Sequence, residues 1–310
     1  MKILISGGAG FIGSFIAERY LELGHEVHII DNLSTGLREN LPSGAKFYEL
    51  DITSPEVWRI FERERFDALS HQAAQMNVRR SVGDPLHDAR TNIIGSLNLY
   101  EACLKYEVKK VIFSSSAGTI YGVQCEYPCG ESHPQNPISP YGIAKLTNER
   151  YLQYYEASFG LNYTALRYAN VFGPRQNPHG EAGVIAIFAE KLFKGERPLI
   201  FGEGEATRDY VYISDVVRAN ELALNPGMRG AYNVSTGTER SVNQIFEDLK
   251  KATGSPLEAI KSEVKKGELE RNSCSYAKIE REWGWRPEVG FEEGMKPTVE
   301  FFRNKALSGK

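Results

Sequence analysis

Short apolar runs alternate with longer amphipathic stretches through the first half of the chain. The amphipathic stretches place apolar residues at helical spacing, which predicts helices at Ile12–Leu23, Pro55–Arg63, Pro85–Tyr106 and Tyr141–Phe159. The short runs between them predict strands. These strands are Lys2–Ser6, Glu26–Asp31, Lys46–Leu50, Ala68–His71, Lys110–Ser115 and Tyr163–Arg167. Repeated strand-then-helix order favours right-handed crossovers, so we expect an α/β fold with a doubly wound parallel sheet and helices on both faces.

The alternation loosens after Pro174, where glycine, proline and charged residues are mixed. This change predicts a second, smaller lobe of mixed α/β structure. Strand-like runs at Tyr210–Ile213 and Ala231–Val234 are expected to rejoin the first sheet, so the two domains are interleaved in sequence. We expect the larger domain at residues 1–173 plus about 208–238, and the smaller lobe at about 174–207 plus 239–310.

Composition and charge exclude several classes of protein. With 310 residues, 41% of them hydrophobic and 25% charged, the chain is neither disordered nor fibrous. A net charge of −3 provides no basic field for nucleic acid or an anionic membrane, so neither is expected as a partner. The most continuous apolar stretch, Val184–Ala189, is too short to span a bilayer.

The start of the chain and its cysteines indicate a reducing compartment. The apolar run Ile3–Ile5 is too short for the core of a signal peptide, so we expect a cytoplasmic protein. Its four cysteines are then expected to be free thiols. Cys125 and Cys129 form a C-x-x-x-C pair, but no second pair or histidine cluster completes a metal site, so no metal is expected.

A glycine triplet stands directly after the first predicted strand and opens the first predicted helix. Gly7, Gly10 and Gly13 would permit a tight turn, close approach of backbone amides to a pyrophosphate, and close packing of helix on strand. Asp31 ends the next strand, where a carboxylate accepts hydrogen bonds from a ribose diol and repels a 2′-phosphate. The pattern therefore predicts NAD, with NADP left open by Arg38 a few residues on.

Tyr141 and Lys145 stand one helical turn apart and therefore share a helix face. A tyrosine is a poor base at neutral pH, but an adjacent ammonium stabilises its phenolate and lowers its pKa. Ser114, Ser115 and Ser116 follow at the end of a predicted strand, in the crevice where open parallel sheets bind ligands. Together these residues predict an acid–base site acting on a substrate hydroxyl.

Several motifs now resemble a known family. They are the glycine triplet, Asp31 to Gly36, His71 to Gln75, the serine run before Tyr121-Gly122, Tyr141-x-x-x-Lys145, and Arg167 to Arg175. From Lys2 to about Met295 the chain is similar to extended short-chain dehydrogenases/reductases, and among them to the NAD-dependent UDP-glucose 4-epimerases. The resemblance implies a Rossmann-type cofactor domain and a smaller nucleotide-sugar-binding lobe.

The resemblance also implies a set of cofactor contacts. It assigns loop amides of Phe11 and Ile12 to the pyrophosphate, Asp31 and Asn32 to the adenosine ribose, and Asp51 and Ile52 to adenine. Lys145 is assigned to the nicotinamide ribose. Further cofactor contacts are implied for Ser34, Thr35, Gly36, Ala73, Ala74, Asn92, Ser114, Tyr141 and Tyr168.

For catalysis and substrate binding the resemblance implies Ser116 as the catalytic hydroxyl, Tyr141 as the base, and Asn170, Arg208 and Glu268 as nucleotide-sugar contacts. The serine loop is one residue longer than in many members, so Ser115 is an alternative to Ser116. Lys265 replaces an arginine that binds the diphosphate in many members, and Arg271 is the alternative at that place.

The implied reaction is epimerisation of UDP-glucose and UDP-galactose at the fourth carbon through a transient 4-keto sugar. Because Asn272 and Ser273 are modest in size, UDP-GlcNAc and UDP-GalNAc are expected substrates as well. The alternatives are a UDP-glucuronate 4-epimerase, a decarboxylase, a 4,6-dehydratase and a non-enzymatic NAD-binding sensor. A homodimer paired through the helices Pro85–Tyr106 and Tyr141–Phe159 is also implied.

Overall fold

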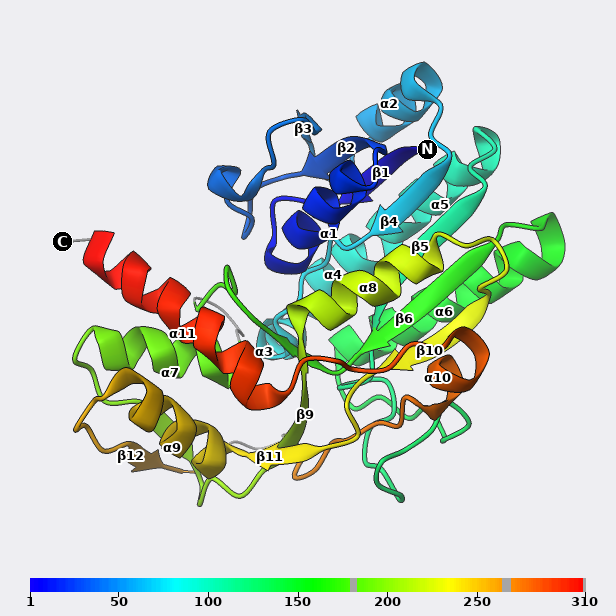
Figure 1. Cartoon of the computed structure of the whole chain (residues 1–310). Helices are drawn as coiled ribbons and strands as arrows, with labels where there is room; N and C mark the ends of the chain where they lie inside the picture. The colour runs from blue at the N-terminus through cyan, green and yellow to red at the C-terminus, as the bar shows by residue number, and fades with distance from the viewer. Residues whose placement is uncertain (179–182, 264–268, 309–310) are drawn as a thin grey trace.

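A parallel sheet of seven strands forms the larger part of the molecule (Figure 1). The structure is a computed structural model and describes residues 1–178, 183–263 and 269–308. The spatial order of the strands is β10-β6-β5-β4-β1-β2-β3, so the chain reverses its direction of winding between β1 and β4. The strands are β1 (Lys2–Ser6), β2 (Glu26–Asp31), β3 (Lys46–Glu49), β4 (Ala68–His71), β5 (Lys110–Ser116), β6 (Tyr163–Tyr168) and β10 (Gly230–Val234). The doubly wound α/β prediction is confirmed, and the first six strands begin at the predicted residues.

Helices cover both faces of this sheet. On one face, Tyr20 of α1 and neighbouring apolar residues of α8 pack against β1 and β2. On the other face, Tyr100 of α5 and Leu152 of α6 belong to the core that also includes α2. These helices are α1 (Phe11–Glu22), α8 (Ile213–Ala223), α2 (Glu56–Glu64), α5 (Gly95–Lys105) and α6 (Pro140–Phe159), with α10 (Ala277–Trp283) beside β10.

The predicted helix Pro85–Tyr106 is interrupted by a wider turn. It divides into α4 (Pro85–Ala89), a π-helical segment η2 (Arg90–Ile94) and α5, and a separate short helix α3 (Val78–Gly83) precedes it. Within η2, the backbone carbonyl of Asn92 accepts hydrogen bonds from Asn148 Nδ2 at 2.7 Å and from Ser96 Oγ at 2.7 Å. The side chains of Asn148 and Ser96 therefore provide hydrogen-bond donors to a backbone carbonyl of the widened turn.

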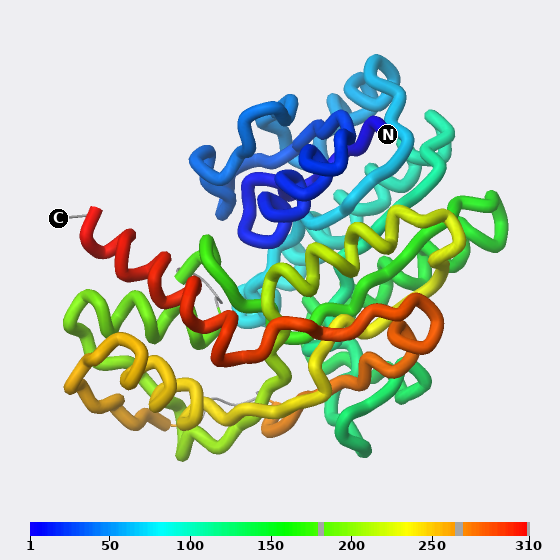
Figure 2. Tube along the Cα trace, viewed as in Figure 1, coloured from blue at the N-terminus to red at the C-terminus, as the bar shows by residue number. Residues whose placement is uncertain are grey.

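The smaller lobe has its own sheets and its own core (Figures 1 and 2). A three-stranded sheet has the order β11-β9-β7, and a two-stranded sheet pairs β12 with β8. Phe172, Phe188, Phe246 and Phe302 are all buried in this core. The elements are β7 (Asn170–Phe172), α7 (Val184–Phe193), β8 (Leu199–Phe201), β9 (Thr207–Tyr212), β11 (Glu239–Ser241), α9 (Val242–Thr253), β12 (Ile260–Ser262) and α11 (Phe291–Ser308).

One strand prediction is wrong and its companion is confirmed. Tyr210–Tyr212 of the run Tyr210–Ile213 belong to β9, which pairs with β7 and β11 and not with the main sheet, and Ile213 begins α8. The physical reason is aromatic packing within the smaller lobe, where Tyr210 and Tyr212 both contact Phe172. The run Ala231–Val234 does rejoin the main sheet, as β10 beside β6. The domain boundaries themselves stay a prediction.

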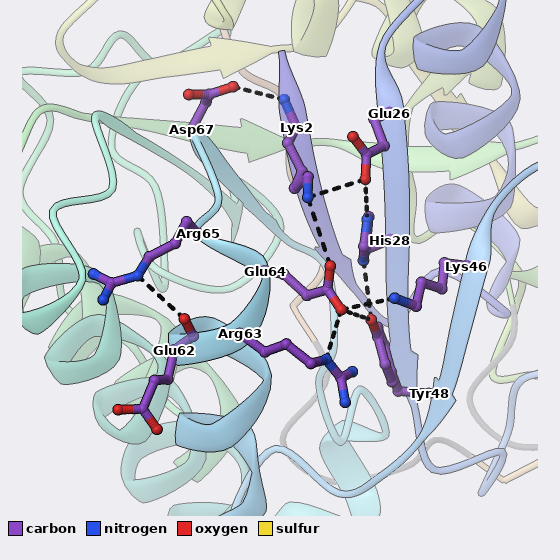
Figure 3. A network of polar contacts seen from close by, with 10 residues as sticks. All are labelled: Lys2, Glu26, His28, Lys46, Tyr48, Glu62, Arg63, Glu64, Arg65 and Asp67. Carbon is purple, nitrogen blue, oxygen red and sulfur yellow. Dashed lines mark hydrogen bonds and ion pairs between the residues drawn. The ribbon is translucent and has the colours of Figure 1, made fainter.

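At the amino ends of β1, β2 and β3, a charged network joins the strands to α2 (Figure 3). Glu64 is its centre, with Lys46 Nζ at 2.7 Å, Arg63 Nε at 2.8 Å and the Tyr48 hydroxyl at 2.9 Å. Its side chain is only 9% exposed. The network holds the amino ends of these strands, at the opposite end of the sheet from the predicted site.

No helix among the described residues is both long enough and apolar enough to cross a membrane. The cytoplasmic location stays a prediction.

Candidate active site

The glycine loop lies at the carboxyl end of β1, where the sheet changes its winding direction. Gly7 has a φ of +75°, and a Cβ atom there would lie 2.6 Å from the backbone nitrogen of Ala73. A Cβ on Gly13 would lie 2.2 Å from the carbonyl oxygen of Gly7. No side chain fits at either position, so the first turn of α1 stays open to a ligand phosphate.

Asp31 binds the glycine loop from the end of β2. Its carboxylate accepts hydrogen bonds from the backbone N–H of Ala9 at 3.0 Å and of Leu33 at 2.8 Å. Burial raises the pKa of this carboxyl, and the two backbone donors act against that shift. Arg38 is directed elsewhere, because it pairs with Glu49 of β3. The acid that favours NAD is therefore in place, and Arg38 is already paired with a carboxylate.

The loop after β2 and the end of β3 meet beside this carboxylate. Asn32 Nδ2 donates to Asp51 Oδ2 at 2.7 Å, and Asp51 also accepts from the backbone and hydroxyl of Thr53. A Cβ on Gly36 would lie 3.0 Å from Asp31 Oδ1, so only glycine lets the loop close on the acid. The structure thus brings together a group of the predicted cofactor residues: Asp31, Asn32, Ser34, Thr35, Gly36, Asp51 and Ile52.

The segment after β4 forms the next wall. Asn92 holds it in place: its Oδ1 accepts from the Gln75 N–H at 2.8 Å, and its Nδ2 donates to the Gln75 carbonyl at 2.9 Å. Ala73 and Ala74 directly precede Gln75, whose backbone forms these two hydrogen bonds with Asn92. The Tyr168 hydroxyl, by contrast, is buried and accepts from Asn220 Nδ2 at 2.7 Å, so it is already engaged by α8.

Lys145 and Tyr141 share the face of α6 that meets the end of β5. Lys145 is 3% exposed, its Nζ donates to the Ser114 carbonyl at 2.6 Å, and it lies 5.6 Å from the centre of the Tyr141 ring. Burial lowers the pKa of Lys145 to about 7, and the carboxylate of Asp88 opposes this shift. The ammonium is thus held beside the phenol by the helix and by a strand carbonyl.

Side chains alternate along a strand, so Ser115 of β5 faces the opposite side from Ser114 and Ser116. The hydroxyl of Ser115 is buried and donates to Glu149 Oε1 at 2.5 Å. Ser116 is partly exposed, and a Cβ atom on Gly118 would lie 3.7 Å from Ser116 Oγ and 3.8 Å from Asn170 Oδ1, so both side chains border Gly118. The structure therefore brings Ser116 toward a predicted substrate residue and directs Ser115 away from it.

The other predicted substrate residues fall in three situations. Arg208 lies on β9, two residues before Tyr210, which is in register with Asn170. Arg271 forms a bidentate ion pair with Glu239: its Nε donates to Oε1 at 3.1 Å and its Nη2 donates to Oε2 at 2.5 Å. Lys265 and Glu268 lie outside the described residues.

Two functional neighbours were not identified from the sequence. Asp88 is 1% exposed, accepts from Asn92 Nδ2 at 2.9 Å and raises the pKa of Lys145. Its spacing of four from Asn92 on a predicted helix was the available signal. His71 links Ser6 Oγ at 2.6 Å to Ser96 Oγ at 2.8 Å. Burial lowers the pKa of His71 to about 3, so it is neutral.

Known proteins are similar to this chain over nearly its whole length. A crystal structure of the UDP-glucose 4-epimerase of Thermotoga maritima, with UDP-glucose, is 50% identical, covers 98% of this chain and 99% of that one, and has a TM-score of 0.96. The enzyme of the same name from Thermus thermophilus, with NAD, is 45% identical over the same shares, with a TM-score of 0.94. The UDP-glucose 4-epimerase of Mycolicibacterium smegmatis is 41% identical over 99% of this chain and 100% of its own length.

A family model described as the NAD dependent epimerase/dehydratase family matches residues 3–235. This range contains the glycine loop, Asp31, the serine run, Tyr141 and Lys145. The chain therefore belongs to the NAD dependent epimerase/dehydratase family, and its cofactor is NAD.

Proposed function

We propose that this protein is a UDP-glucose 4-epimerase that interconverts UDP-glucose and UDP-galactose. The observation that carries the proposal is the buried Lys145 ammonium, 5.6 Å from the Tyr141 ring. The pair stands at the carboxyl end of β5, at the same edge of the sheet as the glycine loop. Similarity to UDP-glucose 4-epimerases over the full length supports the same substrate class.

In this reaction Tyr141 takes the proton from the hydroxyl on the fourth carbon of the hexose, directly or through Ser116 Oγ. The glycine loop and Asp31 would hold NAD, which would supply a reversible hydride acceptor for that carbon and so allow hydride to return to the opposite face of the sugar. Lys145 stabilises the phenolate form of Tyr141 by its charge. The proton then returns from Tyr141 to the product oxygen, so the enzyme ends in its starting state.

Substrate binding has to hold the nucleotide and leave the sugar free to turn. Arg208 is suited to the diphosphate, because a guanidinium pairs with two phosphate oxygens at once. Asn170 lies across the β7–β9 pairing and faces the same space as Ser116. Arg271 is held by Glu239, so as a diphosphate ligand it has to exchange one anionic partner for another.

The residues beside Ser116 argue against elimination of water. A 4,6-dehydratase of this family carries Asp-Glu after its catalytic hydroxyl, whereas this chain has the buried Ala117 followed by Gly118. No acid or base is therefore available at those two positions. A non-enzymatic NAD sensor has no need of the Tyr141–Lys145 pair.

We extend the proposal to N-acetylated substrates. The residues at the expected wall of the sugar pocket are Asn272 and Ser273, each 1% exposed. Asn272 Nδ2 is tied back to the Ala117 carbonyl at 3.3 Å, so no bulky side chain projects from this place. Conversion of UDP-galactose without conversion of UDP-GalNAc would contradict this extension.

We also propose a homodimer. An apolar face extends along α4, η2 and α6, where Leu86, Ile94, Ile143 and Tyr154 are between 49% and 81% exposed. A second copy of the same face would cover it. Light scattering coupled to size-exclusion chromatography should give twice the chain mass of 34.8 kDa for the wild type. For Ile143→Glu it should give the mass of a single chain.

The function is tested with a panel of UDP-sugars and no added NAD. UDP-glucose should give UDP-galactose, and the absorbance of reduced NAD should not accumulate. Appearance of a dehydrated, decarboxylated or stably oxidised sugar in place of the epimer would refute the proposal.

A further inference from the structure

The segment Gly173–Pro178 follows β7 and lies between the smaller lobe and the cofactor domain. In Figure 2 it is the green loop that rises from the lobe toward the dark blue N-terminal region. A Cβ on Gly173 would lie 2.6 Å from Ile213 Cγ2 and 3.5 Å from Phe11 Cζ, so the backbone lies directly on these side chains. Phe11 begins α1, the helix whose first turn is open to the cofactor phosphates.

Arg175 fastens this segment to α1 by three contacts. Its Nη2 donates to Glu18 Oε1 at 2.7 Å, its Nη1 donates to Ser14 Oγ at 3.3 Å, and its guanidinium lies 4.4 Å from the centre of the Phe15 ring. Ser14 in turn donates to the Phe11 carbonyl at 3.0 Å. The contacts of Arg175 therefore reach the first turn of the cofactor helix.

The backbone at Arg175 is in the left-handed region, with a φ of +64°. A side chain in that region is disfavoured unless surrounding contacts hold it. The three contacts with α1 supply that support. Arginine at this position is thus explained by what it binds and not by turn preference.

The same segment also touches the loop that borders the adenosine side of the cofactor site. Asn177 Nδ2 donates to the Thr35 carbonyl at 3.4 Å. Thr35 precedes Gly36, which closes on Asp31. At its other end the segment continues from β7, which begins at Asn170.

We propose that Gly173–Pro178 is a retaining strap for NAD and that Arg175 is its positioning residue. The strap joins the phosphate-binding turn, the adenosine loop and the strand that carries Asn170. An epimerase has to keep its reduced cofactor until hydride returns to the sugar, because earlier loss leaves a keto sugar and an inactive enzyme. The inference rests on NAD as the cofactor and not on the identity of the sugar.

The test measures how fast NAD leaves the purified holoenzyme. The holoenzyme is diluted into a solution that contains an enzyme that destroys free NAD and no sugar. The NAD that remains bound is then measured over time. Arg175→Ala should release NAD roughly fivefold faster than the wild type, since it loses a partly exposed ion pair and a ring contact. Glu18→Gln should give a smaller increase, and the double variant should be no faster than Arg175→Ala alone, because both remove one interaction.

Controls separate retention from general stability. Arg175→Lys keeps the charge and should recover part of the slow release. Arg59→Ala removes an ion pair of the same length, 2.7 Å, with Glu56 on the exposed surface of α2, and should leave the release rate unchanged. The melting temperature of each NAD-free variant is measured in parallel.

A release rate for Arg175→Ala within about 1.5-fold of the wild type would overturn the proposal, even if the variant melts earlier. If Arg175→Ala does not fold, Glu18→Gln decides in the same way. Failure of the sugar panel alone would contradict the proposed function and leave the strap untouched, because no sugar enters this measurement.

Discussion

Replacing Lys145 by methionine tests the electrostatic basis of the active site. The substitution keeps most of the side-chain volume and removes the charge. A unit charge 5.6 Å from the Tyr141 ring, at an effective dielectric constant of about 20, favours the phenolate by about 3 kcal/mol. This corresponds to about two pKa units, so the pKa of Tyr141 should rise by that amount in Lys145→Met.

The wild-type Lys145 has its pKa lowered to about 7, so it is charged below neutrality and loses charge above it. The attraction is mutual, because an ionised Tyr141 raises the pKa of Lys145 in turn. In Lys145→Met, kcat at pH 7 should fall by about 100-fold, and activity should recover as the pH approaches about 10.

The assay is the pH profile of kcat with UDP-galactose, measured together with bound NAD per chain. Lys110→Met is the matched control, because Lys110 is also buried and has its pKa lowered to about 7. Lys110 begins β5, at the end of the strand away from the serines, and its Nζ donates to Asn162 and Thr164. Lys110→Met should lower the melting temperature and leave unchanged the pH at which kcat falls on the acid side of the profile. If kcat of Lys145→Met falls at the same pH as kcat of the wild type while NAD is still bound, the reasoning is refuted.

Three further predictions follow from single contacts. Ser116→Ala should lower kcat by about 100-fold, whereas Ser115→Ala should leave kcat within about threefold and lower the melting temperature; the opposite ranking would exchange their roles. Gly13→Ala should be purified without NAD, since its Cβ would lie 2.2 Å from a carbonyl oxygen, and near-stoichiometric NAD would contradict the loop assignment. Glu64→Gln should lose about 1 kcal/mol of unfolding free energy at pH 7, measured with urea. Hydrogen bonds from Lys46 and Arg63 lower the pKa of Glu64, so this difference should shrink as the pH falls below about 4, and a constant difference would refute the ionic origin.

The sequence was sufficient where structure depends on neighbours along the chain. The first six strands and the glycine loop could be predicted because apolar runs, turn residues and a glycine triplet are local signals. The π-helical turn at Arg90–Ile94 could not, because a single widened turn of five residues is too short to be recognised from the spacing of apolar residues.

Other features depend on partners that are distant in sequence. The pairing of β9 with β7 is set by aromatic packing inside the smaller lobe, which an apolar run alone does not reveal. Asp88 acts on Lys145 only after the chain has folded. The choice between Ser115 and Ser116 also depends on a distant partner, because the hydroxyl of Ser115 donates to Glu149 of α6.

The central claim is that one hydride leaves the fourth carbon of the sugar and returns to it within a single site. The most direct measurement uses UDP-glucose carrying deuterium on that carbon, incubated with the purified protein and no added NAD. Mass spectrometry and NMR of the product should show UDP-galactose with the deuterium still on the fourth carbon. UDP-galactose carrying hydrogen there, or a requirement for stoichiometric free NAD, would contradict the account.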